Sequence, residues 1–180
     1  MSFLEKTLTL LRPRYRVAAL VGDLATDNDA QRLARSQAPV RQITTGTLCH
    51  LEAEMIRTAL DSWDVGNPDF LFIKNVGDLV CPATFDLGEG LRLVLFSVTE
   101  GEDKPLKYPT IFNTADIAVI TKIDLAEVVE FDRAAAHENI QSVRPGMQIW
   151  EVSAKTGVGM DLWIDFLATC QTKTPAEQAQ

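Results

Sequence analysis

The sequence predicts an α/β domain in which a mostly parallel β-sheet is flanked by helices. Short runs rich in valine, isoleucine, leucine and phenylalanine alternate along the chain with stretches whose apolar residues recur at helical spacing. The apolar runs show little polar alternation, which is typical of parallel strands buried on both faces. The length of 180 residues suits one domain. We expect that domain to cover residues 1–170, followed by a disordered tail at 171–180.

The expected elements begin with a helix around Phe3, Leu4, Leu8 and Leu11, with no strand before it. Six strands are expected at residues 17–21, 40–44, 70–75, 91–98, 116–121 and 148–152. The clearest helix is expected at 48–63, where seven apolar residues form one stripe. A weaker helix is expected at 131–143, where Pro145-Gly146 ends it, and the last helix starts near Val158.

Composition excludes several classes of protein. The chain is 46% hydrophobic and 23% charged, which excludes a disordered or fibrous protein. A net charge of -8 argues against nucleic acid or an anionic membrane as the main partner. No apolar run approaches the roughly 20 residues of a membrane helix. Three unevenly spaced cysteines indicate thiols or metal ligands in a reducing compartment, so we expect a cytoplasmic protein.

Two segments at consecutive strand ends favour a guanine nucleotide. They are Thr121-Lys122-Ile123-Asp124 and Ser153-Ala154-Lys155, and ligands of open α/β sheets bind at the carboxyl ends of strands. A carboxylate such as Asp124 accepts hydrogen bonds from the N1–H and the exocyclic amine of guanine, a donor pair that adenine lacks. The Lys122 stem would lie along the base, and the Ala154 N–H would meet the guanine oxygen. Each segment alone is better explained as a solvated loop or turn, but the two together favour guanine.

Asp23 is a candidate ligand for Mg²⁺ because it follows the strand at 17–21. Asp27 or Thr26, a few residues later, equally suits the N-cap of the next helix. We favour Mg²⁺ binding for Asp23 and capping for Asp27.

Cys49 and His50 open the helix expected at 48–63, and thiolate with imidazole suits Zn²⁺ or Ni²⁺. Adjacent helical residues point about 100° apart, so this pair alone is a poor chelate. Cys81 is a plausible third ligand, and a two-fold dimer would bring a second set. The alternative is that Cys49 and Cys81 are small buried hydrophobic residues, and from spacing alone that alternative is preferred.

Several segments together resemble the hydrogenase nickel-incorporation GTPases of the HypB type. The resemblance extends from Ser2 to about Leu167. It rests on Gly22-Asp23, the Thr-Gly-Thr-Leu-Cys-His-Leu run at 45–51, the Asn-Val-Gly-Asp-Leu-Val-Cys-Pro-Ala run at 75–83, the Phe-Asp-Leu-Gly run at 85–88, the run at 98–109, and the motif at 121–124. The Cys-His and Asn-Val-Gly…Cys-Pro segments are far more specific than a general GTPase signature. They separate this family from the related urease accessory GTPases.

The resemblance implies a P-loop GTPase fold of the SIMIBI type that binds GTP or GDP with Mg²⁺ and forms a homodimer. It implies nickel delivery to the large subunit of [NiFe]-hydrogenase together with a HypA-type metallochaperone. The Ni²⁺ or Zn²⁺ ligands at the dimer interface would be Cys49, His50 and Cys81. Asp124 and Lys122 would contact guanine, with Ser153-Ala154-Lys155 nearby, and Asp23 would hold Mg²⁺.

The sequence departs from the family in two respects. The family has a strand and a glycine-rich lysine loop directly before the first helix, whereas the printed sequence starts at Met1, so we expect the fold without its first strand and P-loop. Lys74 stands where the family has glutamate, and Asp78 where it usually has asparagine. Either the sequence is a fragment of a complete GTPase, which the missing loop favours, or it is a degenerate metal-binding relative, which Lys74 favours. We expect weak or absent triphosphate binding and impaired hydrolysis.

Overall fold

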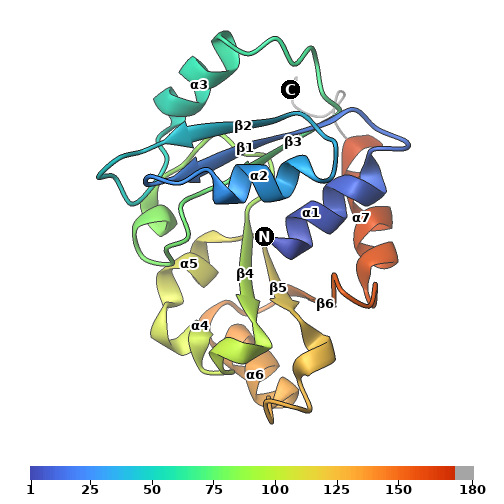
Figure 1. Cartoon of the computed structure of the whole chain (residues 1–180). Coiled ribbons are helices and arrows are strands. Elements are labelled where there is room, and N and C mark those ends of the chain that lie inside the picture. The colour runs from blue at the N-terminus through green and yellow to red at the C-terminus, as the bar shows by residue number, and fades with distance from the viewer. Residues whose placement is uncertain (173–180) are drawn as a thin grey trace, which may run out of the picture.

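The computed structural model of the chain describes residues 1–172, and residues 173–180 of the expected tail lie outside the described residues. Six parallel strands form two three-stranded sheets (Figure 1). The first sheet has the order β2-β1-β3 and comprises β1 Val17–Asp23, β2 Val40–Thr44 and β3 Phe70–Lys74. The second has the order β4-β5-β6 and comprises β4 Leu93–Ser97, β5 Ile117–Thr121 and β6 Gln148–Val152.

The prediction of parallel strands flanked by helices is confirmed, but the expectation of one sheet is wrong. Parallel ladders pair Ala19 of β1 with Val40 and Val17 with Phe70, while Ile117 of β5 pairs with both Leu93 and Gln148. No ladder joins β3 to β4 within residues 1–172. Apolar runs mark where strands lie but do not specify which strands pair, so the division was not visible in the sequence.

The helices are α1 Ser2–Leu11, α2 Asn28–Ala34, α3 Ala53–Asp61, α4 Lys104–Lys107, α5 Pro109–Thr114, α6 Arg133–Val143 and α7 Met160–Thr172. Short 3₁₀ turns occur at η1 Cys81–Thr84, η2 Val98–Glu100 and η3 Ile123–Leu125. The expected helix at 48–63 is wrong at its start, because α3 begins only at Ala53. Helix α7 continues to Thr172, two residues beyond the expected end of the domain. None of the described helices combines the length and the apolar character that a membrane crossing requires.

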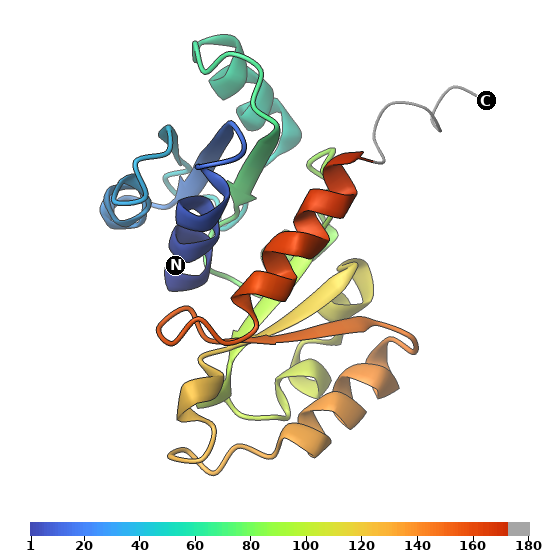
Figure 2. The same ribbon diagram turned by 90° about the vertical axis from the view of Figure 1, so that its right-hand side faces the viewer.

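Helices α1 and α7 lie side by side and join the two sheets through one core (Figures 1 and 2). Its buried members come from both helices and from strands of both sheets: Phe3, Leu8, Leu11, Val17, Ala19, Val21, Ile117, Val119, Val152, Met160, Trp163, Ile164 and Leu167 are among them. Inside it the Trp163 indole N–H donates to Thr7 Oγ1 over 3.2 Å, and both residues have no exposed surface. The first helix is therefore held by tertiary packing against α7 and both sheets.

The opposite faces of the sheets are covered separately. Helix α6 lies on the face of the second sheet away from α7 (Figure 2), where Ala136 and Ile140 pack with Phe96 and Phe112. In the first sheet, Leu20 packs with Ile56 of α3. Each sheet is thus apolar on both faces, as its uninterrupted apolar strands predicted.

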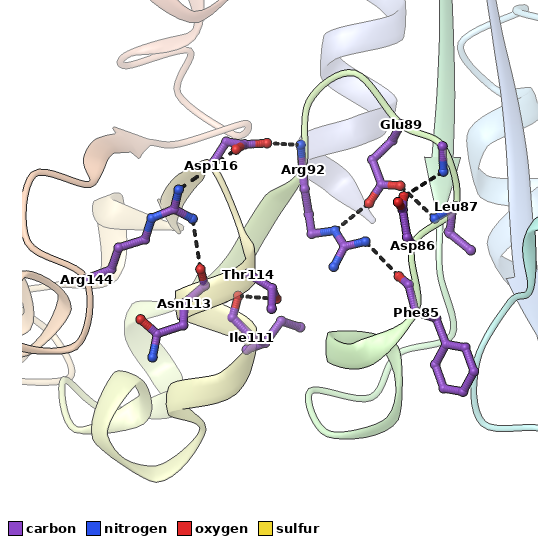
Figure 3. Close-up of polar contacts among 11 residues, drawn as sticks. Phe85, Asp86, Leu87, Glu89, Arg92, Ile111, Asn113, Thr114, Asp116 and Arg144 are labelled. Atoms are coloured by element: carbon purple, nitrogen blue, oxygen red, sulfur yellow. Dashed lines mark hydrogen bonds and ion pairs between the residues drawn. The ribbon is translucent and has the colours of Figure 1, made fainter.

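Both sheets begin with the same arrangement of an arginine and an aspartate. The backbone N–H of Arg16, directly before β1, donates to Asp69 Oδ2 over 2.8 Å. The backbone N–H of Arg92, directly before β4, donates to Asp116 Oδ2 over 2.7 Å (Figure 3). Each aspartate comes immediately before the strand that pairs with the one after its arginine: Asp69 before β3 and Asp116 before β5. Each pair therefore fixes the register at the amino end of its sheet.

Candidate nucleotide and metal site

The residues expected to contact guanine meet where β5 and β6 end. Ser153 is fully buried, and its hydroxyl donates to Asp124 Oδ1 over 2.6 Å. The N–H of Thr156 donates to Ser153 Oγ over 3.1 Å, so the turn after β6 holds the serine hydroxyl in place. Ser153 therefore fixes the orientation of the half-buried Asp124 carboxylate.

The remaining residues of the two motifs occupy the turns around this pair. Thr121 donates from its hydroxyl to the carbonyl of Phe96 over 3.1 Å, which ties the ends of β5 and β4 together. Lys122 has a φ of 60° and an exposed side chain. Ala154 is half-buried and Lys155 is exposed in the turn that follows β6. The structure thus places both motifs beside each other at one end of the second sheet.

Asp23 builds the turn that leads into α2. Its Oδ1 accepts hydrogen bonds from the backbone N–H groups of Ala25 and Thr26 and from the Thr26 hydroxyl. The bond from the Thr26 N–H is the main reason that the pKa of Asp23 lies below its usual value. Asp27 precedes α2, but its carboxylate accepts from the Gln31 side chain and makes no capping bond. The expectation that Asp27 caps the helix with its side chain is therefore wrong.

Lys74, at the end of β3, is paired with an acid. Its ammonium lies 2.8 Å from Asp29 Oδ2 on α2 and 3.4 Å from the carbonyl of Gly22. The Met1 amine lies nearby, and burial lowers its pKa. Asp29 opposes that shift, while the charges of Arg32, Lys74 and Lys122 reinforce it. Lys74, at the end of the first sheet, and Lys122, at the end of the second, thus both act electrostatically on the start of α1.

Cys49 and Cys81 are joined as a disulfide, although 32 positions separate them. The expectation that these two cysteines are free thiols is therefore wrong for this structure. Only the reduced cysteines could act as thiolate ligands, so metal binding by them stays a prediction. Their Cα atoms are 6.1 Å apart and both residues are half-buried. The loop after β2 and the loop after β3 therefore meet at these two sulfur atoms.

Cys49 and His50 lie in the irregular segment at residues 45–52, ahead of α3, and not on a helix. The Thr45 hydroxyl donates to the Leu48 carbonyl over 2.6 Å. The Leu51 N–H donates to Asn75 Oδ1 over 2.8 Å, and the Leu51 side chain is fully buried. A Cβ placed on Gly22 would lie 2.7 Å from Leu51 Cγ, so this glycine makes room for the leucine. The objection to two adjacent ligands on a helix does not apply to this loop.

The His50 ring lies beside Cys49 and stacks on an aromatic ring. It stacks on Phe85 with 3.6 Å between ring centroids and 13° between planes. Its Nδ1 lies 4.0 Å from Cys49 Sγ. Its buried Nε2 is 3.5 Å from a Glu52 carboxylate oxygen but has no hydrogen-bond partner within the described part of the chain. An imidazole with an unsatisfied nitrogen beside a cysteine suits a metal ligand.

Phe85 is fixed in turn by the loop that leads to β4 (Figure 3). The Arg92 guanidinium donates to the Phe85 carbonyl over 2.6 Å and also pairs with the Glu89 carboxylate. Because the backbone of Arg92 is tied to Asp116, this network connects the second sheet to the aromatic ring that stacks on His50.

Sequence reasoning missed Asp78 as a neighbour of the sulfur atoms. One carboxylate oxygen of Asp78 and the Sγ atoms of Cys49 and Cys81 all lie within 4.8 Å of one another. Within residues 1–172, these three are the group of histidine, cysteine or acidic residues whose ligand atoms lie close enough together to share a metal ion. The group includes neither His50 nor Asp23. The signal in the sequence was the position of an aspartate three residues before Cys81.

Comparison with known proteins identifies the family. The model of the CobW/HypB/UreG nucleotide-binding domain matches residues 2–151. The chain belongs to this family. It is 45% identical over 166 residues to the hydrogenase maturation factor HypB of Azotobacter vinelandii, which covers 92% of the chain and 55% of that relative. It is 39% identical over 164 residues to the probable hydrogenase maturation factor HypB of Methanocaldococcus jannaschii, covering 91% of the chain and 74% of that relative.

A solved structure supports the same assignment. The crystal structure of HypB from Helicobacter pylori in complex with nickel superposes with a TM-score of 0.89 at 36% identity, over 99% of this chain and 85% of that one. The resemblance to HypB-type maturation GTPases inferred from the motifs is confirmed. The chain spans about half the length of the A. vinelandii relative.

Proposed function

We propose that this chain is the metal-carrying, guanine-binding domain of a hydrogenase maturation factor, with nickel as its cargo. One observation carries the proposal: Cys49 and Cys81 meet in space beside His50, although they belong to loops 32 positions apart. In the reduced protein these residues offer two thiolates and an imidazole, a ligand set that suits Ni²⁺ or Zn²⁺. Nickel is favoured over zinc because the H. pylori relative is described in complex with nickel.

Guanine nucleotide is the second ligand in this proposal. Asp124, oriented by Ser153, would accept the two donors of the guanine edge, and Lys122 would lie along the base. Asp23 would hold Mg²⁺ with the oxygen that its turn does not use. The family resemblance extends the proposal to a cytoplasmic homodimer that works with a HypA-type metallochaperone and passes nickel to the [NiFe]-hydrogenase large subunit.

A second candidate function is a dimeric metal-binding protein that does not hydrolyse GTP. Lys74 favours it, because its ammonium lies at the ends of β1 and β3, where it acts electrostatically on Asp23. A cation at this position repels Mg²⁺, whereas the glutamate of the family would attract it. In this alternative the metal loops keep their role and phosphate release does not occur.

The test is a titration of the full, reduced chain with Ni²⁺ and Zn²⁺ against a chromophoric chelator, without oxygen. We expect Cys49→Ala and Cys81→Ala to abolish tight binding and Cys170→Ala, on α7 outside the disulfide, to retain it. Equal binding by the wild type and Cys49→Ala would refute the metal role. Steady phosphate release from GTP by the wild type would exclude the second candidate, which predicts none. Absence of release would not exclude the first candidate, because the sequence already predicts impaired hydrolysis.

A further inference from the structure

We propose that Asp78 is a direct ligand of the cargo metal, so that one chain contributes a carboxylate together with the thiolates of Cys49 and Cys81. The inference rests on the proposed function, because it concerns the same metal. Its basis is that a carboxylate oxygen of Asp78 and both sulfur atoms lie mutually within 4.8 Å. The ligands implied by the family resemblance are Cys49, His50 and Cys81, and they do not include an acid at this position.

The backbone holds the Asp78 carboxylate in place. Its Oδ1 accepts from the N–H of Val80 over 2.9 Å, and its own N–H donates to the Val76 carbonyl over 2.7 Å. Cys81 follows this turn at once as the first residue of η1. An ionised carboxylate offers about four acceptor positions, so the bond from Val80 leaves capacity for a metal. The turn thus presents an oxygen and a sulfur from positions three residues apart.

The distances and charges suit a small divalent ion. Ligand atoms about 2.0–2.3 Å from a tetrahedral metal lie roughly 3.3–3.8 Å from one another. Once the disulfide is reduced, the two sulfur atoms move apart toward that range, and the Asp78 oxygen, which lies within 4.8 Å of both, reaches it by small side-chain rotations. Two thiolates and a carboxylate carry three negative charges around the ion, one more than the thiolates alone, which strengthens the attraction. His50, whose Nδ1 is 4.0 Å from Cys49 Sγ, is placed to complete the set.

The decisive variants are Asp78→Asn and a matched control, Asp86→Asn. Asparagine keeps the oxygen that accepts from the Val80 N–H, but its neutral side chain is a much weaker metal ligand than a carboxylate. Asp86 makes the same kind of turn, its Oδ1 accepting from the N–H of Gly88 over 2.9 Å, but it is exposed and outside the ligand trio. Both changes remove one acid from the segment between β3 and β4, so the pair separates ligation from general electrostatics.

The experiment measures Zn²⁺ and Ni²⁺ affinity of the reduced full chain by chelator competition, and the near-ultraviolet thiolate-to-nickel charge-transfer absorption at saturation. Loss of even an outer-shell partner weakens metal binding by roughly 10–100-fold. We therefore expect Asp78→Asn to weaken binding by at least about tenfold. We expect Asp86→Asn to stay close to the wild type and Asp78→Asn to retain the sulfur-to-nickel absorption.

Several results would overturn the inference. Unchanged affinity in Asp78→Asn refutes ligation by Asp78 while leaving the metal-cargo function intact. Equal weakening by Asp86→Asn would show a general charge effect. Loss of the sulfur-to-nickel absorption in Asp78→Asn would show that the variant disrupts the loop, and Asp78 would then be a structural residue. A wild type that binds no metal when reduced would overturn the proposed function and this inference together.

Discussion

The hydroxyl of Ser153 donates a 2.6 Å hydrogen bond to the carboxylate of Asp124 across 29 positions of sequence. Ser153 lies directly after β6 and Asp124 lies in η3, just after β5. The parallel pairing of β5 with β6 brings these two strand ends together, so the ladder itself positions the acid.

Asp124→Asn should lose selectivity for guanine. The asparagine amide presents a donor where the carboxylate presented only acceptors, so one donor of the guanine edge is left without a partner. Unmaking a hydrogen bond to a charged group costs about 1.5–3 kcal/mol, roughly 10–100-fold in affinity. Calorimetric titration with GDP, and with ADP for comparison, measures the change. Ser153→Ala should produce a smaller loss in the same direction, and unchanged GDP affinity in both variants would contradict the assignment.

Gly22→Ala should destabilise the protein and disturb the metal loop. The added Cβ would lie 2.7 Å from Leu51 Cγ, and Leu51 follows His50 directly. Overpacking of this kind costs about 1–3 kcal/mol. Gly77→Ala is the control, because a Cβ there meets nothing within 4 Å and the residue lies in the loop that leads to Cys81. Urea unfolding and Ni²⁺ affinity of the reduced proteins check both effects, and equal behaviour of the two variants would be inconsistent with this packing.

Thr7→Val should destabilise the contact between α1 and α7. The fully buried Thr7 hydroxyl accepts from the Trp163 indole and donates to the Phe3 carbonyl, so valine leaves a buried N–H unpaired. We expect a loss of about 1–3 kcal/mol in the free energy of unfolding. Thr9→Val removes a similar bond to the Glu5 carbonyl on the exposed side of α1 and should change stability by less than about 0.5 kcal/mol. Similar losses for both variants would rule out a specific role of the indole bond.

Asp69→Asn should change how stability depends on pH. Hydrogen bonds from the Arg16 side chain and backbone hold the pKa of Asp69 below its usual value. A lowered pKa means that the charged carboxylate stabilises the folded protein above the unfolded pKa of about 3.9, and that this contribution disappears as the pH falls through the lower folded value. The wild type should therefore be more stable than Asp69→Asn at pH 7, with the difference closing below about pH 4. A constant difference from pH 7 to pH 3 in thermal unfolding would argue against this linkage.

Most strands and helices were predictable because each is long enough to show its own period. Strands β2 and β6 fall at the expected residues, and the apolar stripe of Met160, Trp163, Ile164 and Leu167 predicts α7. The start of α3 was not predictable, because Leu48 and Leu51 continue the helical spacing by coincidence. Leu51 is buried against Gly22 and bonded to Asn75, and both of these contacts are remote in sequence.

The sequence pointed to several residues of the candidate site, but not to Asp78 and not to the way the two metal loops meet. Asp124 and Ser153 followed from the rule that strand ends carry ligands. The bond between Cys49 and Cys81, and the place of Asp78 beside them, depend on how two loops fold across the sheet, and no local pattern encodes that approach. The paired ammonium of Lys74 likewise depends on Asp29, which lies 45 positions away on α2.

The bond between the two sulfur atoms runs from the loop after β2 to the loop after β3, and β1 lies between those strands. It therefore closes a loop of the backbone that passes over the carboxyl end of β1, where the Leu51 side chain packs on Gly22. An ion shared by the same two sulfurs would close the same loop without a covalent link. Metal binding would then also cross-link the two loops at this end of the sheet, and metal release would remove that cross-link.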